Sequence, residues 1–209
     1  MLFRSIAKCP KIAQIECHII WAPIEICIER DAARKRTVGK EVIDRMLKRF
    51  QAPYYDEGID EIKTVLSDNF NQGEYTANAI QAMNIPHDNS HHTLSIFNHC
   101  CEAYKQIMNN DKCDDTLVLA ALFHDVGKPY VKAFVNAKGE PSDTAHYYQH
   151  QCVGAYMAYG LVADNLRVDV AWLVSTHMAP FLNEKYYKNL PAYLKNSVDL
   201  LHEADLAAH

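Results

Sequence analysis

The sequence predicts a mainly α-helical fold with a small α/β segment at its N-terminus. Of the 209 residues, 49% are hydrophobic and 22% charged, so the chain can bury a substantial core. Strand-like alternation of β-branched residues occurs only in the first part of the chain, whereas helical periodicity recurs from residue 93 to the end. We therefore expect a boundary near residue 86, with one segment at residues 1–86 and a second domain at residues 87–209.

The N-terminal segment combines strand and helix patterns. Residues 11–31, KIAQIECHIIWAPIEICIERD, alternate apolar and polar side chains and are rich in isoleucine, which favours a strand interrupted at Pro23. Residues 29–50 are helical in character at both ends, with Gly39 between the two pieces. Residues 52–68 are expected to form a loop followed by a short strand or turn.

The periodicity of the C-terminal part predicts successive helices, at residues 93–110, 114–127, 149–166, 167–178 and 193–209. In the first of them, one side carries Leu94, Phe97, Cys101, Tyr104 and Met108. The second begins with acidic residues and is expected to stop at the glycine of residue 127. Polar connectors are expected at residues 136–145 and 183–189.

Composition excludes several classes of protein. The chain has no apolar run of the roughly 20 residues that a membrane span requires, and its start lacks the features of a secretory signal. The seven cysteines are irregularly spaced and include no Cys-x-x-Cys pair, which favours reduced thiols over a disulfide framework or a cysteine-based zinc site. These features predict a cytoplasmic protein with no membrane partner.

Charge is distributed unevenly along the chain. Residues 1–50 hold 11 Lys and Arg against 6 Asp and Glu, whereas the remainder holds 10 against 20. A basic N-terminal part and an acidic remainder indicate two segments with different roles. Solvated charged faces are common, however, so charge alone identifies no partner.

Imidazoles and carboxylates recur on the predicted helices in an order that suggests a metal site. Each of these residues alone is most simply explained as a structural or solvated side chain, but the combined pattern favours a function. Their nitrogen and oxygen atoms are ligands that divalent metals accept. Adjacent residues point about 100° apart on a helix, so the consecutive pair can share a site only because the helix ends there. The candidate metal ligands are His99, His124, Asp125, His150, His177 and Asp205.

The segment LVLAALFHDVGKP, residues 117–129, resembles the signature of the HD-domain metal-dependent phosphohydrolases. The order His99, His124-Asp125, Asp205 matches the family's H…HD…D ligand set, and the resemblance covers residues 91–209. It implies an all-α HD-domain bundle that hydrolyses phosphate monoesters or diesters.

Two further segments, HHTLSIFNHCCEAY and HYYQHQCVGA, resemble the HD domains attached to bacterial tRNA nucleotidyltransferases. Those domains usually carry Glu where this chain has Gln151. The resemblance implies a nucleotide or nucleic-acid-end substrate, with 2′,3′-cyclic phosphates among the candidates. The alternative is a nucleotide-sensing module of the same fold that does not turn its ligand over.

With His150 and His177, the set resembles the family variant that holds two metals, in which Asp125 bridges the ions. Two cations about 3.5–4 Å apart can clamp the oxygens of a phosphate. The resemblance therefore implies one or two divalent ions, with iron, manganese, cobalt, nickel and zinc as candidates and magnesium as a further option. Lys128 is expected to add positive charge beside the phosphoryl group, and His146 to act as an acid or to contact the substrate.

The basic stretch near residue 30 carries Arg30, Arg34 and Arg36, which could grip phosphates. Together with IIWAPIEICIERD before it, this stretch resembles the lid region of P-loop polynucleotide kinases. No G-x-x-x-x-G-K-[ST] motif occurs in the sequence, so transfer of phosphate from ATP is not expected. The segment is therefore expected to be part of a larger kinase–phosphohydrolase with a missing upstream kinase part, or a packing element for the helical bundle.

The adjacent pair His91-His92 is expected at a helix start or at the rim of a pocket, and four further histidines are expected to be structural or exposed: His18, His87, His202 and His209. The sequence leaves the oligomeric state open, a homo-oligomer included.

Overall fold

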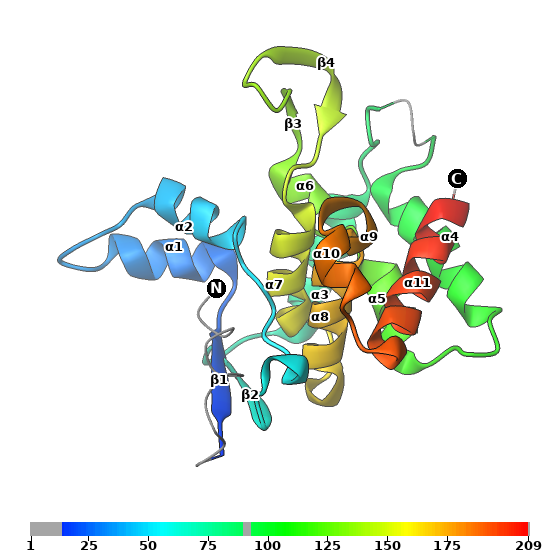
Figure 1. The fold of residues 1–209 in the computed structure, drawn as a ribbon. Helices are drawn as coiled ribbons and strands as arrows, with labels where there is room; N and C mark the ends of the chain where they lie inside the picture. The colour runs from blue at the N-terminus through cyan, green and yellow to red at the C-terminus, as the bar shows by residue number, and fades with distance from the viewer. Residues whose placement is uncertain (1–13, 90–92, 209) are drawn as a thin grey trace.

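The computed structural model describes residues 14–89 and 93–208, so His209, the pair His91-His92 and residues 11–13 of the predicted strand lie outside the described residues. Its architecture is mainly helical, with two small two-stranded sheets, as the sequence predicts (Figure 1). None of the helices in these ranges combines the length and the apolar character that crossing a bilayer requires.

The N-terminal segment is a parallel pair of strands joined through helices. Strand β1 (Glu16–Trp21) is followed by α1 (Ile24–Ala32), α2 (Lys40–Leu47), the short 3₁₀ turn η2 (Tyr55–Glu57), β2 (Glu61–Leu66) and α3 (Gln72–Met83). The strands pair in parallel from Glu16 with Glu61 to Trp21 with Leu66. Strand β2 confirms the short strand expected within residues 52–68.

The prediction that strand structure continues after Pro23 is wrong, because helix α1 begins at Ile24. Proline cannot donate to a strand ladder, and its fixed φ suits the start of a helix. The isoleucines at 24 and 28 are four residues apart and therefore share the face of α1 that packs on the core. Helix α3 was not predicted at all, since it carries small and polar side chains rather than a strong apolar stripe.

The second part is a bundle of helices around the almost completely buried α7. Its long elements are α4 (Ile96–Met108), α5 (Asp115–Phe123), α7 (His150–Leu161), α8 (Arg167–Thr176) and α11 (Ala192–Ala207). Shorter elements join them: α6 (Lys128–Val131), β3 (Ala133–Val135), β4 (Pro141–His146), η3 (Asp164–Leu166), α9 (Ala179–Leu182) and α10 (Glu184–Lys188). All five predicted helical segments are confirmed.

Two details of the bundle differ from the sequence-based expectation. The face of α4 that packs in the core carries Ile96, His99, Cys100, Ala103 and Ile107, whereas Met108, placed on the predicted stripe, is half exposed. Both faces of α4 carry apolar side chains, so their hydrophobicity alone does not tell which face is buried. The buried face also includes the polar His99, which a count of apolar residues leaves out. The two polar connectors contain structure of their own, namely the β3–β4 hairpin, which projects from the bundle in Figure 1, and helix α10.

Trp21 joins the N-terminal segment to the bundle. Its ring is 1% exposed, its Nε1 donates to the carbonyl of Tyr156 at 2.7 Å, and it packs edge-on against Phe70 and Tyr75. A Cβ added at Gly160 of α7 would lie 2.2 Å from this ring, so the glycine permits the close approach. The buried residues of both parts form one hydrophobic core, with the expected boundary at residue 86 lying in the connection between α3 and α4.

Candidate metal centre

The ends of the bundle helices bring the six candidate ligands together. His99 lies in α4, His124 is the C-cap residue of α5, and Asp125 follows it directly. His150 is the first residue of α7, His177 is the C-cap residue of α8, and Asp205 lies in the last turn of α11. Helix α5 ends at Phe123, so the consecutive pair turns toward one point, as the sequence predicts.

The four ligand histidines share one hydrogen-bonding arrangement that fixes their tautomer. In each ring Nδ1 faces a backbone carbonyl oxygen, which can only accept, so Nδ1 carries a proton and Nε2 points toward the centre. Histidines that bind metals are oriented by contacts of this kind. The pairs are His99 with Ala208 at 2.6 Å, His124 with Ala121 at 2.8 Å, His150 with Tyr147 at 2.9 Å, and His177 with Val174 at 2.7 Å.

The Nε2 atoms of these rings approach one another closely. The separation is 3.3 Å between His99 and His124, and 3.1 Å between His150 and His177. Two lone pairs at these distances in a buried site repel one another unless a positive charge lies between them. The rings are therefore arranged around a cation, either a proton or a metal ion.

The carboxylate of Asp125 connects the two pairs of rings. Its Oδ2 lies 3.6 Å from His99 Nε2 and 3.4 Å from His124 Nε2, whereas its Oδ1 lies 3.3 Å from His150 Nε2. The six residues thus contain two groups with metal-binding geometry that share Asp125: one with His99 and His124, the other with His150 and His177. Oδ2 also lies 2.5 Å from Lys128 Nζ, so this oxygen would be shared between the lysine and a bound ion.

Asp205 adds a second carboxylate to the first group. Its Oδ1 lies 2.8 Å from His99 Nε2 and 3.4 Å from His124 Nε2. Its side chain is 19% exposed, against 8% or less for the other ligands, so the centre is most open to solvent on the α11 side.

The electrostatics of the centre favour ionised carboxylates and a neutral His177. Burial opposes the charge on Asp125, but Lys128 and His124 outweigh it and hold the pKa well below its usual value. Burial likewise opposes the charge on Asp205, and His124 and His99 lower its pKa. For His177, burial first and the neighbouring His150 and His124 next lower the pKa to about 3, so this ring is an uncharged ligand at neutral pH.

His124 behaves in the opposite way. Burial disfavours its charged form, but Cys100, Asp125 and Asp205 more than offset burial and raise its pKa well above the usual value. A proton on this ring would supply the positive charge that the carboxylates require. A divalent ion would supply the same charge to all the ligands at once, so metal binding is expected to displace that proton.

Lys128 reaches the same centre from the first turn of α6. Its Nζ forms an ion pair of 2.5 Å with Asp125 Oδ2 and lies 3.3 Å from His87 Nε2 and 5.4 Å from the centre of the Tyr147 ring. Lys128 is 8% exposed, so its positive charge acts in a buried environment where Coulomb interactions are strong. The expected role of Lys128 beside a phosphoryl group stays a prediction.

Sequence reasoning missed the part that His87 plays in this centre. The sequence predicts a structural or exposed side chain for His87. In the structure this residue is 1% exposed, and its Nε2 lies 4.0 Å from Asp125 Oδ2. Its Nδ1 contacts the carbonyl of Leu94 at 2.9 Å, and its own carbonyl accepts from the hydroxyl of Tyr147. The only local signal is Pro86 before it, which indicates a turn and gives no direction for the ring.

His146 lies outside α7, because it ends strand β4. A hairpin forms there instead, and the ring contacts Ser142 at 3.1 Å and stacks on Tyr148. These contacts lie in the hairpin rather than among the metal ligands, so a role for His146 in acid catalysis or substrate contact stays a prediction.

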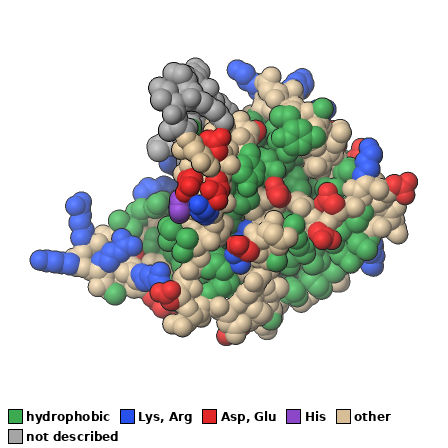
Figure 2. Space-filling view, turned by 90° about the horizontal axis from the view of Figure 1, so that it is seen from below, with side chains coloured by type: hydrophobic (Ala, Val, Ile, Leu, Met, Phe, Trp, Pro, Cys, Tyr) green, Lys and Arg blue, Asp and Glu red, His purple; other side chains and the backbone are tan. Residues whose placement is uncertain are grey.

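The predicted phosphate-binding arginines lie away from the centre. Arg30 is exposed at the end of α1, and Arg34 and Arg36 are exposed in the loop that follows. That loop projects from the molecule on the side opposite α4 and α11 (Figure 1), and Lys and Arg side chains gather on the corresponding lobe at the left of Figure 2. Any contact of these arginines with phosphate is therefore remote from the six ligands.

Comparison with known families accounts for this arrangement. Residues 87–206, more than half of the chain, match the HD domain. The chain belongs to the HD domain family. The match spans α4 to α11 and contains all six ligands, Lys128 and His87. None of the curated proteins and none of the solved structures matches the chain.

The residues present fit a divalent metal, which HD domains bind. The donor set is nitrogen and carboxylate oxygen, and the paired Nε2 atoms require a positive charge between them. The HD domain of this chain therefore has the residues of a metal-dependent hydrolase. The thiols of the chain are not needed, because none of them belongs to either metal-binding group.

Proposed function

We propose that the protein is a metal-dependent phosphohydrolase that acts on nucleotides or nucleic-acid ends, with 2′,3′-cyclic phosphates among its substrates. The observation that carries this proposal is the convergence of the Nε2 atoms of four histidines on the carboxylate of Asp125. Membership of the HD domain family supports hydrolysis of a phosphate ester as the reaction. The similarity to HD domains of tRNA nucleotidyltransferases, together with the basic N-terminal segment, supports a nucleotide-containing substrate.

Two divalent ions fit the geometry better than one, because Asp125 presents a different oxygen to each pair of rings. Iron, manganese, cobalt, nickel and zinc all accept such ligands, and magnesium is the least suited because it prefers oxygen donors. Bound ions of this kind polarise phosphoryl oxygens and lower the pKa of water.

The protein side chains supply orientation and a fixed positive charge. The carbonyl contacts at Nδ1 hold each ligand ring with its Nε2 toward the centre. Lys128, held between Asp125 and His87, is placed to donate a hydrogen bond to a phosphoryl oxygen that lies beside Asp125. The surrounding helices exclude bulk water, so this charge is not screened as it would be at the surface.

Turnover with added metals tests the proposal. The metal-loaded protein is expected to hydrolyse a generic phosphodiester such as bis(p-nitrophenyl) phosphate, and to open a 2′,3′-cyclic nucleotide, with activity lost on chelation and restored by Mn²⁺. Elemental analysis of the same samples relates rate to bound metal. Tight binding of nucleotides with no hydrolysis under any metal would contradict the proposal and favour a nucleotide-sensing module.

The N-terminal segment adds a second, separate proposal. We infer that residues 1–86 are related to the lid part of a polynucleotide kinase. The parallel pairing of β1 with β2 through intervening helices supports this, because such connections are typical of α/β kinase folds. Its docking through Trp21 also fits a packing element for the bundle.

A further inference from the structure

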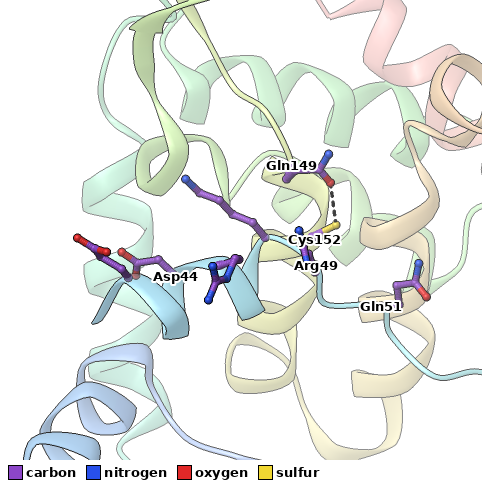
Figure 3. A pocket seen from close by; sticks show the side chains of 8 residues that line it. Asp44, Arg49, Gln51, Gln149 and Cys152 are labelled. Carbon is purple, nitrogen blue, oxygen red and sulfur yellow. Dashed lines mark hydrogen bonds between the residues drawn. The ribbon is translucent and has the colours of Figure 1, made fainter. Parts of the chain in front are cut away.

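A groove lies beside the metal centre, between the N-terminal segment and the bundle. It consists of two adjoining hollows of about 640 and about 710 Å³, which share Arg49, Gln51, Gln149 and Cys152. Figure 3 shows Arg49, from the chain that leaves α2, next to Gln149 and Cys152 at the start of α7, with Gln51 farther along the same segment. We call it the α2–α7 groove. Each hollow is within the range of pockets that hold small ligands.

The groove is close to the metal ligands along the chain. Gln149 and Gln151 flank His150, and both line the larger hollow. Thr176 and Met178 flank His177 and also line it. A ligand seated in the larger hollow would therefore lie against the same two helix ends that present the second pair of rings to the metal centre.

Three cations border the groove without ion-pair partners among the described residues. They are Arg45, Lys48 and Arg49 at the end of α2 and directly after it, and all three are exposed. Of the acidic residues in the smaller hollow, Asp44 is already paired with Lys40 at 2.5 Å, which leaves Glu41 as the counter-charge. The larger hollow adds one more acidic residue, Glu57, so the three cations still outnumber the carboxylates that remain, and this excess of positive charge favours a ligand with more than one negative charge.

The floor of the groove contains a buried acceptor without a donor. The side chain of Gln151 lines the larger hollow, the residue is 9% exposed, and its Oε1 accepts no hydrogen bond from the described residues. An unsatisfied buried carbonyl is costly, so turning the Gln151 amide toward the hollow to accept an N–H from a ligand would recover that cost. Every nucleobase carries at least one N–H group on its edge.

We propose that the α2–α7 groove binds single-stranded nucleic acid next to the end that the metal centre hydrolyses. A base enters the larger hollow and donates to Gln151 Oε1, while backbone phosphates lie along Arg45, Lys48 and Arg49. This assignment rests on the proposed function and narrows its substrate to an oligonucleotide end. Three rim cations exceed what a single terminal phosphate requires, and an amide oxygen at the floor suits a base better than a phosphate.

Binding of a strand that cannot be hydrolysed tests the groove separately from turnover. The metal-loaded full chain is titrated into a short fluorescent single strand with phosphorothioate linkages, and affinity is read from anisotropy. Arg49→Glu is expected to weaken binding by about tenfold or more, because a charge-assisted contact becomes a repulsion. The control Lys112→Glu, which reverses an exposed lysine in the turn between α4 and α5, should bind as the unchanged protein does.

Salt dependence tests whether the rim contacts phosphates. The triple variant Arg45→Ala, Lys48→Ala, Arg49→Ala is expected to reduce the slope of log affinity against log salt by about 2, since each phosphate contact to a single strand contributes about 0.7. Gln151→Met, which keeps the size of the side chain and removes the acceptor, should weaken binding severalfold while leaving the melting temperature equal or higher. A packing role for Gln151 would leave affinity unchanged.

The outcomes separate the two proposals. Equal effects of Arg49→Glu and Lys112→Glu, or equally tight binding of polyglutamate of the same charge, would overturn the groove assignment. Hydrolysis of a generic phosphodiester without groove-dependent strand binding would overturn it as well, while leaving the proposed function in place. Strand binding through the groove by a protein that hydrolyses no phosphate ester under any metal would instead overturn the proposed function.

Discussion

Asp125→Asn is expected to lose bound metal and to reduce phosphodiester hydrolysis more than about 100-fold. Changing a partner of a metal ligand typically costs 10–100-fold in metal affinity or activity, and Asp125 contacts both groups of rings directly. The amide keeps the shape of the side chain but removes its charge and one acceptor oxygen. It also leaves Lys128 buried without its counter-ion, which is strongly destabilising.

The matched control for this variant is Asp115→Asn, at the opposite, exposed end of α5. It makes the same chemical change in the same helix and should keep both metal and turnover. The comparison uses elemental analysis, the initial rate of hydrolysis and circular dichroism to check that each variant is folded. Full metal content and full activity in folded Asp125→Asn would contradict the role assigned to this carboxylate.

Gly127→Ala is expected to destabilise the protein and to disturb the second pair of rings. A Cβ at this position would lie 2.2 Å from the carbonyl oxygen of His150 and 2.6 Å from the amide nitrogen of Gly154. Both atoms belong to the backbone of α7, so the whole helix start must move. Overpacking of this kind costs about 1–3 kcal/mol or more, and the shift would carry His150 away from Asp125 and His177.

Denaturant unfolding and metal content measure this effect together. The control is Gly73→Ala in the first turn of α3, where the added methyl meets only Asn71 at 3.6 Å. Alanine is favoured over glycine in a helix, so this control should be neutral or slightly stabilising. Equal stability and equal metal content of the two variants would show that the turn before α6 and the start of α7 need not approach so closely.

The ligand set could be predicted from the sequence because its members have a distinctive order. The consecutive pair His124-Asp125 at the end of an apolar helix is such a signal, since a polar pair there has no role in packing. The structure confirms that the bundle folds His150 and His177 onto the same point. The sequence predicts that Gly127 ends a helix, whereas the structure shows that this glycine lets the backbone approach α7 closely.

Other features depend on tertiary contacts that no local pattern encodes. The ring of His87 reaches Lys128 only because the connection before α4 folds back over the centre, and that path is not visible in residues 86–88. The isoleucines after Pro23 are compatible with a strand or a helix. Packing of their side chains against the core favours the helix. The α2–α7 groove joins segments about 100 residues apart in sequence, so neither its cations nor Gln151 could be placed beforehand.

The central claim is that the buried imidazoles and carboxylates surround divalent metal. A crystal structure of the metal-loaded protein, with anomalous diffraction recorded at the absorption edge of the metal found by elemental analysis, tests it most directly. We expect two anomalous peaks that share Asp125, one at the Nε2 atoms of His99 and His124 and the other at those of His150 and His177. Well-ordered rings in these positions with no peak among them would contradict it.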